Sequence, residues 1–538
     1  MRAVFDGDWQ LSERERVNKV KKKPGLLRSS ATVSAMTTLS RILGLLRDIV
    51  FARYIGAGGA ADAFYVAFKI PNFLRRLFAE GAFSQAFVPV LSEYRSRGSI
   101  EATRYLIDRV CGCLGVSLIG IVVVVVVAAP LVTAIFGSGF LYQGQYDKFW
   151  LASSLLRITF PYLLLISLAG FVGSILNSYD RFAVPAFTPV LLNVALIGAA
   201  VLVSPRLQEP VYALAWGVLV AGVLQLSFQL PFLARLGLFP RPRVEWRDPG
   251  VRRILTLMAP AIFGVSISQI NLTLDTVLAS FLQNGSISWL YFSDRLNELP
   301  LGVFAIGIST VILPNLSRHF AEGSERFDQV VNWALRLVLL IGVPASLALL
   351  VIARPILFTL FQYDAMSAFD MQMSTLSLRA YAAGLVAFML VKVLASAYFS
   401  RQDTRTPVRV GIVAMVTNMV LNFAFALPLL YLWNVGHVGL AAATSAAAFL
   451  NAGLLIRGLR RAGALVFDAE WPAFLLRLLL ASLVMVGVLL FLHSEQSDYA
   501  SASARLRVTQ LAVLVLAGMV SFLLALLACG MRFRHLRN

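Results

Sequence analysis

The sequence predicts an all-α polytopic membrane protein with fourteen transmembrane helices, arranged as two six-helix lobes and a C-terminal pair. Three observations predict this fold class. The 538-residue chain is 58% hydrophobic and only 14% charged, with a mean hydropathy of +0.76, whereas soluble domains have about 45–50% apolar and about 25% charged residues. Apolar runs of membrane-spanning length recur along the whole chain. Two separate blocks also repeat at nearly the same sequence offset.

The apolar runs define the predicted helices in order. Each is long enough for an α-helix to cross a hydrocarbon core of about 30 Å. The fourteen segments are 30–54, 62–94, 107–136, 149–178, 183–204, 211–236, 253–283, 287–318, 328–352, 374–400, 407–432, 438–460, 472–493 and 506–530. Pro71 and Pro89 lie inside the long second segment, where we expect a kink or an extension beyond the bilayer.

The charge of the connecting loops predicts the topology. Alternate connections are basic, such as 235–253 (RLGLFPRPRVEWRDPGVRR), while those between them, such as 282–286 (LQNGS), are neutral to acidic. The positive-inside rule then places both termini in the cytoplasm, in agreement with an even number of spans. The net charge of +19 is therefore explained by topology, and we expect no nucleic-acid partner.

The internal repeat predicts the two lobes. Residues 63–94 align without a gap on 288–319 at an offset of 225, and residues 213–237 align on 439–463 at an offset of 226. A duplicated unit with an even number of spans inserts both copies in the same orientation, so the symmetry axis follows the membrane normal. The predicted divisions are an N-terminal extension (1–28), an N-lobe (29–237), a basic and amphipathic cytoplasmic linker (238–252), a C-lobe (253–463) and a final pair of helices with a cytosolic tail (464–538).

Charged residues inside three apolar segments are the candidate functional residues. A charge at bilayer depth costs about 2.5–3.5 kcal/mol on insertion scales, so such side chains usually face a water-filled cavity. Helical spacing places Arg41 and Asp48 on one face of the first segment, with Arg47 on a neighbouring face. In the second segment one face carries Lys69, Asn72, Arg76 and Glu80, and Arg75 lies on another face. In the eighth segment one face carries Ser288, Tyr291, Arg295 and Glu298, with Asp294 on its flank. Facing stripes from two lobes would line one central cavity, and its surplus of cations favours an anionic cargo. The structural alternative is that these arginines reach an interface or pair with nearby acids, as Arg76 could with Glu80.

An isolated acid and two loop carboxylates complete the candidates. Asp275 lies near the middle of the seventh segment without a basic residue within one turn. It is either protonated or binds Na⁺ or H⁺, and the sequence leaves both readings open. Asp364 and Asp370 are the only paired carboxylates in a predicted external loop. Since the chain has neither a Walker-type loop nor a sizeable extramembrane domain, we expect no enzyme active site.

Several motifs resemble one transporter family. SRILGLLRDIVFAR (40–53) and GAGGAADAFYVAFKIPNFLRRLFAEGAFSQAFVPVLSEY (56–94) are similar to the amino-terminal signature of the MurJ/MviN lipid II flippases, and TVILPNLS and YFSRQDTRTPV are similar to later parts. The resemblance covers about 26–532. It implies a member of the multidrug/oligosaccharidyl-lipid/polysaccharide exporter superfamily in the bacterial inner membrane that moves lipid II to the periplasmic leaflet by alternating access.

The resemblance also implies roles for individual residues. The substrate diphosphate would be bound by four cavity arginines, which are Arg41, Arg47, Arg75 and Arg295. Other functionally sensitive positions would be Asp48, Asp62, Asn72, Glu80, Ser288, Asp294 and Glu298. A Na⁺ site in some members corresponds to Asp275, Asn418, Asn422 and Thr444 with a carbonyl near Leu440, although Asn422 replaces an acidic ligand of that site. The last two helices would form a groove for the polyprenyl tail.

Two other functions compete with this reading. A cation-coupled drug or polysaccharide-lipid exporter of the same superfamily would have the same fold, but a drug exporter needs an apolar or acidic pocket for cationic compounds. A membrane glycosyltransferase acting on a lipid-linked sugar would depend on an external carboxylate such as Asp364 or Asp370. For the flippase, we expect lipid II and membrane lipids as partners, contact with other cell-wall synthesis proteins, and no cofactor apart from Na⁺ or H⁺ as a coupling ion.

Overall fold

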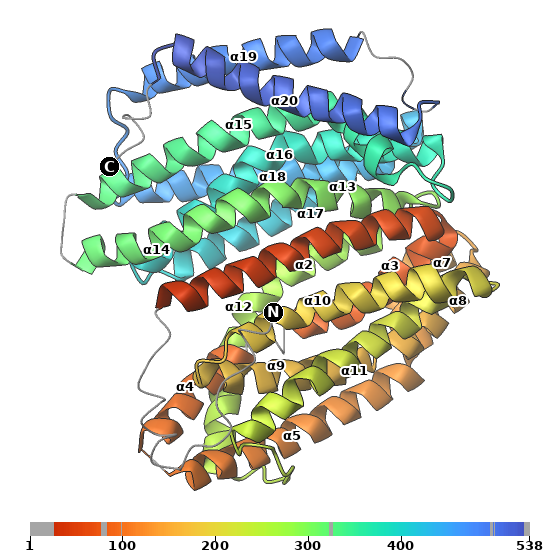
Figure 1. Cartoon of the computed structure of the whole chain (residues 1–538), viewed down its shortest axis with the longest axis vertical. Helices are drawn as coiled ribbons and strands as arrows, with labels where there is room; N and C mark the ends of the chain where they lie inside the picture. Colours follow the sequence, from red (N-terminus) through yellow and green to blue (C-terminus); the bar gives the residue numbers. More distant parts are fainter. Residues whose placement is uncertain are drawn as a thin grey trace.

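The computed structural model describes residues 26–76, 83–97, 99–321, 326–494, 499 and 501–531, and this part of the chain is helical without a strand. Most of the predicted N-terminal extension therefore lies outside the described residues. The first helix begins at Leu26, slightly before the predicted boundary. The helices run roughly side by side in two groups, one above the other in Figure 1.

The N-lobe contains the helices of the first six predicted segments. These are α2 (Leu26–Tyr54), α3 (Gly59–Arg75), α4 (Phe83–Arg97), α5 (Ile100–Val127), α6 (Ala129–Phe136), α7 (Ser138–Tyr142), α8 (Tyr146–Thr159), α9 (Tyr162–Ser178), α10 (Ala183–Gly198) and α11 (Val211–Arg235). A π-helical turn, η3 (Ala199–Val203), and a 3₁₀ turn, η4 (Ser204–Arg206), extend α10. The second segment is divided between α3 and α4, and residues 77–82 between them are not described.

The C-lobe and the final pair follow α12 (Pro249–Ala279). They comprise α13 (Ser286–Pro300), the π-helical η5 (Leu301–Ala305), α14 (Ile306–Ala321), α15 (Arg326–Phe361), α16 (Ala368–Ser400), α17 (Arg405–Trp433), α18 (Gly436–Arg461), α19 (Trp471–Ser494) and α20 (Ala504–Ala528). The last two pack on each other and on α15, and they form the outermost layer in Figure 1.

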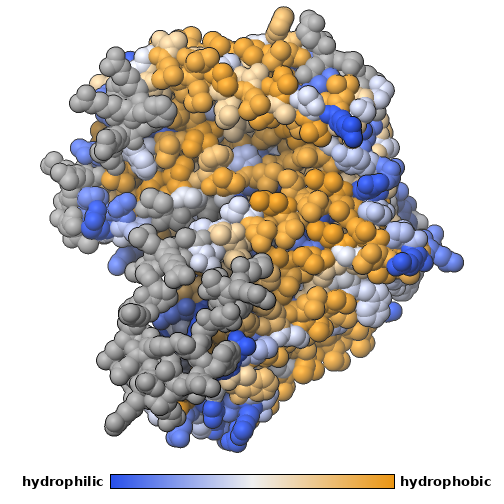
Figure 2. Space-filling model, in the orientation of Figure 1, coloured by the Kyte–Doolittle hydropathy of each residue, from blue (hydrophilic) through white to orange (hydrophobic). Residues whose placement is uncertain are grey.

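In the described residues, every predicted apolar segment is largely helical. Among the described residues, eleven helical spans are long and apolar enough to cross a membrane, and α2, α3 with α4, and α12 do not meet that criterion. The count of fourteen therefore stays a prediction. Apolar side chains cover the flank of the helices, while hydrophilic residues gather toward the helix ends (Figure 2). The protein is thus a multi-pass membrane protein.

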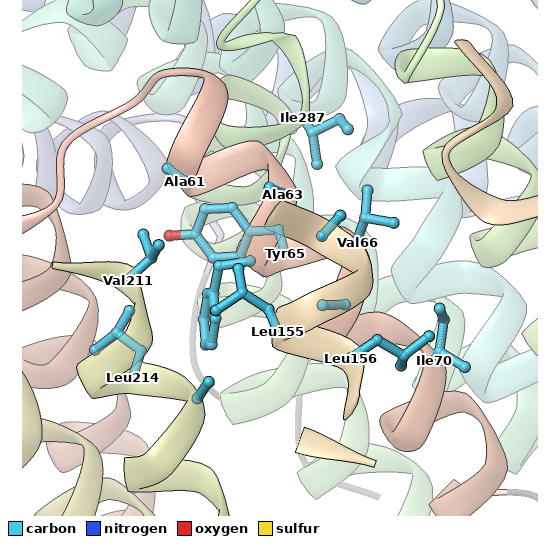
Figure 3. Close-up of a cluster of buried hydrophobic side chains, with 14 of the residues drawn as sticks. Ala61, Ala63, Tyr65, Val66, Ile70, Leu155, Leu156, Val211, Leu214 and Ile287 are labelled. Atoms are coloured by element: carbon cyan, nitrogen blue, oxygen red, sulfur yellow. The ribbon is translucent and has the colours of Figure 1, made fainter. Parts of the chain in front are cut away.

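Small residues hold the core of the N-lobe together. Along α3, Ala61, Ala63 and Ala67 are at most 2% exposed, and small residues let membrane helices approach closely. Leu155 of α8 and Leu214 of α11 pack in the same cluster (Figure 3). α3, which carries several candidate site residues, is therefore firmly fixed within its lobe.

Helix α12 connects the two lobes, and it does not belong to the C-lobe alone. It starts at Pro249, because the Asp248 carboxylate accepts hydrogen bonds from the amides of Gly250 and Val251 and so caps the helix. It packs on α4 and α5 of the N-lobe and on α17 and α18 of the C-lobe. The preceding linker, predicted to be amphipathic, has no regular secondary structure over 238–245.

Candidate functional site

A polar cavity of about 380 Å³ lies between the lobes, among α2, α3, α10, α12, α13 and α16. It brings together most of the charged residues predicted from the three stripes. Its described lining includes six cationic side chains, Arg41, Arg47, Lys69, Arg75, Arg76 and Arg295, and three acidic ones, Asp275, Asp294 and Glu298. Glu80 lies outside the described residues. The described lining is therefore formally cationic.

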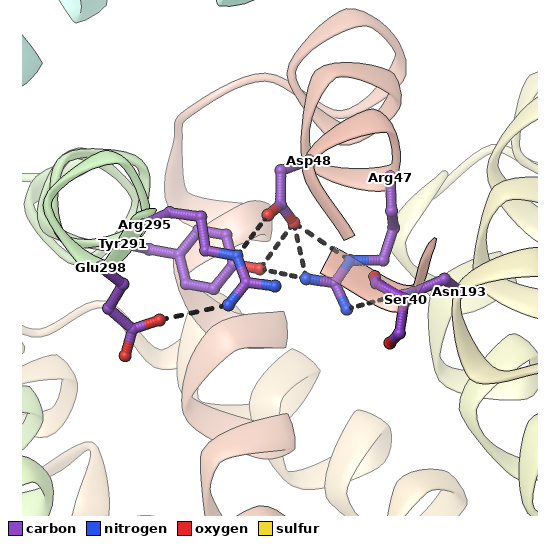
Figure 4. Close-up of polar contacts among 7 residues, drawn as sticks. All are labelled: Ser40, Arg47, Asp48, Asn193, Tyr291, Arg295 and Glu298. Carbon is purple, nitrogen blue, oxygen red and sulfur yellow. Dashed lines mark hydrogen bonds and ion pairs between the residues drawn. The ribbon is translucent and has the colours of Figure 1, made fainter. Parts of the chain in front are cut away.

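At its wall, one carboxylate binds two arginines from different lobes (Figure 4). Asp48 is fully buried, and its Oδ1 accepts hydrogen bonds from Arg47 Nε at 3.0 Å and Arg47 Nη2 at 2.7 Å. Its Oδ2 accepts from Arg295 Nε at 2.7 Å. The hydroxyl of Tyr291 donates to Asp48 Oδ1 at 2.8 Å and accepts from Arg47 Nη2 at 3.0 Å. Asp48 thus links α2 of the N-lobe to α13 of the C-lobe.

This network adds the pairing that the helical stripes leave open. Sequence spacing aligns Asp48 with Arg41, but the structure pairs Asp48 with its neighbour Arg47 and with Arg295. Arginine side chains are long enough to reach a carboxylate on an adjoining face. Arg295 also donates to Glu298 at 3.3 Å, so the structural-pairing alternative holds in part for two of the four arginines.

Two further contacts position the arginines. Arg47 Nη1 donates to Asn193 Oδ1 at 3.1 Å, and the Asn193 amide in turn donates to the Ser40 carbonyl at 3.0 Å. A Cβ added to Gly44 would come within 2.9 Å of Arg295 Nη2. Gly44 therefore makes the space in which the Arg295 guanidinium lies beside α2.

Arg41 and Arg75 have different surroundings from the other pair. The Arg41 guanidinium lies directly against the backbone of Gly302 in η5, and π-helical turns are frequent at functional sites. It forms no ion pair with a carboxylate in the described part of the chain. Arg75 Nε donates to Asn72 Oδ1 at 3.2 Å, so Asn72 orients a cavity arginine.

Asp62 and Ser288 were predicted together with the cavity residues, but neither is part of the described cavity lining. The Asp62 carboxylate is 1% exposed and accepts hydrogen bonds from the amides of Gly285 (2.8 Å) and Ser288 (2.9 Å). It also accepts from Ser288 Oγ (2.7 Å) and Lys148 Nζ (3.0 Å). Asp62 thus caps the N-terminus of α13, where a negative charge is favourable.

This cap is part of a larger contact between the lobes at the end where the neutral loops gather. Gly139 of the N-lobe lies against the backbone of Ser280, whose Oγ accepts from the Gly139 amide at 3.0 Å. Gln143 donates to the carbonyl of Leu282 at 3.0 Å. Arg53 Nε donates to Asp364 at 2.8 Å. We call these contacts, together with those of Asp62, the clasp.

The four residues of the expected Na⁺ site lie together on α12, α17 and α18, and Asp275 also lines the central cavity. Asp275 Oδ1 accepts from the amides of Asn422 (2.8 Å) and Asn418 (3.3 Å), and Oδ2 accepts from Thr444 Oγ1 (3.4 Å). Thr444 also donates to the Leu440 carbonyl at 3.0 Å. The buried Oδ1 of Asn422 has no hydrogen-bond partner among the described residues. This donor set of oxygens suits a hard cation.

The loop carboxylates have structural partners. Asp364 pairs with Arg53. Asp370 forms a capping box with Ser367 at the start of α16 and accepts from Trp289 Nε1 at 2.8 Å. Because Asp364 already serves the contact between the lobes and Asp370 caps a helix, both are poorly placed to serve a glycosyltransferase.

Two residues of the site were missed in the sequence. Asn193, which positions Arg47, is a single amide inside the apolar run VLLNVALIG, and that isolation was the available signal. Lys148, which pairs with Asp62, precedes a predicted segment directly and looks like an ordinary interfacial lysine.

Comparison with known proteins identifies the family. The family described as "Lipid II flippase MurJ" matches residues 51–510. A probable lipid II flippase MurJ of Vibrio cholerae is 50% identical over 95% of this chain and 98% of its own length. The lipid II flippase MurJ of Burkholderia cenocepacia is 42% identical over 86% and 89% of the two chains.

Solved structures give the same answer. A lipid II flippase MurJ in an inward closed conformation superposes with a TM-score of 0.77 at 27% identity, covering 92% of this chain and 97% of that chain. An inward-facing multidrug MATE transporter of the MOP superfamily superposes with a TM-score of 0.62 at 16% identity, over 81% and 98% of the two chains, which shows a shared fold. The chain belongs to the MurJ family of lipid II flippases.

Proposed function

We propose that this protein moves lipid II, the lipid-linked peptidoglycan precursor, from the cytoplasmic to the periplasmic leaflet of the bacterial inner membrane. The observation that carries the proposal is the cationic cavity between the lobes, bounded by Arg41, Arg47, Arg75 and Arg295. A planar guanidinium can bind phosphate oxygens through two parallel hydrogen bonds, so several arginines suit a diphosphate. The family membership, at 50% identity to a probable flippase, supports the same substrate.

The cavity avoids the main energetic obstacle to this movement. Transfer of a diphosphate and a sugar-peptide through hydrocarbon would leave charged and polar groups without hydrogen bonds. A hydrated cavity lined by cations keeps those groups solvated, while the polyprenyl tail stays in the membrane. We propose that the outer pair, α19 and α20, provides the groove along which that tail lies.

Alternating access would expose the cavity to one side at a time. The clasp joins the lobes at the end of the neutral loops, so access to the cavity in this conformation would be from the other end. By the positive-inside rule the basic end and both termini lie in the cytoplasm. Release of the clasp, with closure at the basic end, would then present the headgroup to the periplasm. Cysteine labelling of the two ends in intact cells tests this orientation.

Na⁺ is the coupling ion that the C-lobe residues fit best. The Asp275 carboxylate, the Asn422 and Asn418 amides, the Thr444 hydroxyl and the Leu440 carbonyl would supply oxygen ligands to a bound Na⁺. The single carboxylate there would neutralise a monovalent ion. Transport in vesicles with Na⁺ replaced by choline, at equal ionic strength, tests the requirement. Contact with other cell-wall synthesis proteins stays a prediction.

One transport experiment tests the proposal. Purified protein in vesicles is given labelled lipid II in the inner leaflet, and its arrival outside is followed with a membrane-impermeant reagent. We expect movement of lipid II that is lost in Arg295→Ala, and no movement of a neutral lipid-linked sugar. A cation-coupled drug exporter would instead move a cationic dye, and it would not depend on Arg295.

A further inference from the structure

A second cavity, separate from the central one, lies on the outer flank of the N-lobe. It measures about 90 Å³ and lies between α4, α5, the linker before α12 and the first turns of α12. Among the described residues its lining is apolar apart from Ser117 and the thiol of Cys113, and it includes Val110, Leu114, Trp246, Ile254 and Met258. We call it the flank pocket.

The flank pocket faces the region of the lipid tails. Its rim residues Trp246 and Leu255 are 44% and 42% exposed. On α5, which forms one wall, the neighbouring Val116 and Ile119 are 48% and 51% exposed. Exposed apolar side chains of this kind cover the membrane-facing flank of the molecule in general. The pocket therefore opens toward acyl chains.

The linker at the mouth of the pocket is fixed in place. The amides of Arg243 and Arg241 donate to the carbonyl and the carboxylate of Asp108 on α5, at 3.0 Å and 2.7 Å. The backbone of Arg243 lies against Gly112, where a Cβ would not fit. Arg109 pairs with Glu245 at 2.6 Å. The linker backbone is thus held against α5 at the pocket rim.

The same linker presents cations beside the pocket. The side chains of Arg241, Arg243 and Arg247 are exposed, and none forms an ion pair with a described carboxylate. Together with Trp246 they combine exposed arginines with an aromatic ring at the basic end of the molecule, as is typical of the membrane interface. Clusters of this kind attract anionic lipid headgroups.

The C-lobe has an equivalent arrangement, but its own side chains fill the space. An offset of 225 places Glu245 and Trp246 on Glu470 and Trp471. In the C-lobe the linker also lies along the matching helix, since Asn332 of α15 donates to the Val466 carbonyl at 2.9 Å. Trp471, however, is only 8% exposed, and its Nε1 donates to Asn332 Oδ1 at 2.8 Å.

Aromatic rings complete the filling on that side. The ring of Trp471 lies 5.0 Å from Phe467 and 5.7 Å from Phe474, in edge-to-face contacts. The N-lobe leaves the matching place open, with Trp246 turned out to the surface. Two copies of one structural unit therefore differ in whether this space is occupied by protein.

We propose that the flank pocket binds part of one acyl chain of an anionic glycerophospholipid, with its phosphate against Arg243 and Arg247. A dry apolar cavity of about 150 Å³ accommodates benzene, so about 90 Å³ holds a short stretch of a chain whose remainder lies in the bilayer. Because one wall is α5 and the other is α12, the bound chain joins the N-lobe to the helix that connects the lobes. The proposal does not rest on the proposed function.

Photocrosslinking tests the acyl-chain part. The full-length protein in lipid nanodiscs is irradiated with a phosphatidylglycerol that carries a diazirine in one chain, and adducts on α5 and α12 peptides are quantified. Ser117→Trp fills the pocket and should lower these adducts at least tenfold. Val123→Trp, on the exposed lipid face of the same helix, is the matched control and should leave them unchanged. Equal adducts in Ser117→Trp and wild type would overturn the proposal.

A second set of variants tests the headgroup part, and it decides the matter if Ser117→Trp does not fold. The double variant Arg243→Gln/Arg247→Gln changes only exposed side chains and should abolish the preference for the phosphatidylglycerol probe over its phosphatidylcholine analogue. Arg405→Gln/Arg409→Gln, exposed at the same end, should not. Equal labelling by both probes in the wild type refutes the anionic preference. Displacement of the adducts by a polyprenyl phosphate, but not by phosphatidylglycerol, identifies a prenyl chain and refutes the proposal.

Discussion

Replacement of Asp62 by asparagine should release the clasp and shift the protein toward the form open at the neutral-loop end. Four hydrogen bonds converge on the buried carboxylate, from Lys148, Gly285 and twice from Ser288. An asparagine keeps one acceptor oxygen, and it turns an NH₂ group toward donors on the other side. The charge that balances Lys148 is lost as well.

The size of the shift follows from these contacts. Removal of one partner of a buried ion pair costs about 3–5 kcal/mol, because the remaining charge is left without compensation. Since each 1.4 kcal/mol is a factor of ten, the closed form should lose a factor of roughly 10² to 4 × 10³ in population relative to the open form. Ser288→Ala removes only one hydroxyl donor and should cost about 1 kcal/mol.

Accessibility of a single cysteine measures the shift. Ile287 lines the cavity just inside the clasp and is 6% exposed. In a background without the three native cysteines, Ile287→Cys should react slowly with an impermeant maleimide added from the neutral-loop side. Asp62→Asn should raise that rate by about the factor above, up to the limit set by full opening. An unchanged rate, in a variant that has lost lipid II movement, would refute the assignment of Asp62 to a gate.

Three further changes have defined outcomes. Gly44→Ala should displace the Arg295 guanidinium and weaken lipid II binding about tenfold with little change in melting temperature, because the displaced atom is the end of a flexible side chain. Asp275→Asn should make vesicle transport insensitive to replacement of Na⁺ by choline. Asp403 lies in the loop before α17, where hydrogen bonds from Thr406 lower the pKa of its carboxyl below the ordinary 3.8. The stability it contributes is fully present above 3.8 and is lost below it, as the pH falls through the lowered pKa of the folded state, so Asp403→Asn should flatten the acid end of a melting-temperature curve.

Each of these has its own control. Gly453→Ala adds a methyl group where no atom lies within 4 Å and should bind lipid II normally; equal loss in both glycine variants would contradict the role of Gly44. A Na⁺ requirement that survives Asp275→Asn would move the ion site elsewhere. If Asp403→Asn melts like the wild type at every pH, the hydrogen bonds that Thr406 donates to Asp403 contribute nothing measurable to stability.

The fold was predictable because periodicity and loop charge are local properties of the chain. Hydrophobic runs located the helical segments of the described residues, and the offset of 225 predicts a duplicated unit. Helix α12 was not predictable in the same way. Its apolar pattern gives its length, but nothing local indicates that its first turns pack on α4 and α5 while its later turns pack on α17.

The sequence predicted which charged residues line the cavity better than it predicted which side chains contact one another. Burial cost alone indicates that Arg41, Arg47 and Arg295 face a cavity. Helical spacing could not assign Asp48 to Arg295, which is 247 positions away, or Asp62 to the N-terminus of α13. Those contacts arise only once the two lobes are packed together, and a single sequence does not contain their relative position.

The position of Asp48 suggests how binding of an anion could be coupled to movement of the lobes. Its carboxylate lies on α2, and it holds Arg295 of α13 at 2.7 Å. A diphosphate that binds Arg47 and Arg295 competes with Asp48 for the same N–H groups, since each guanidinium has a limited set of donors. Contacts between the arginines and the diphosphate would then replace part of the direct contact between Asp48 and the arginines. The attraction between α2 and α13 therefore differs between the empty and the loaded cavity. A ligand can shift a conformational equilibrium only through a difference of this kind.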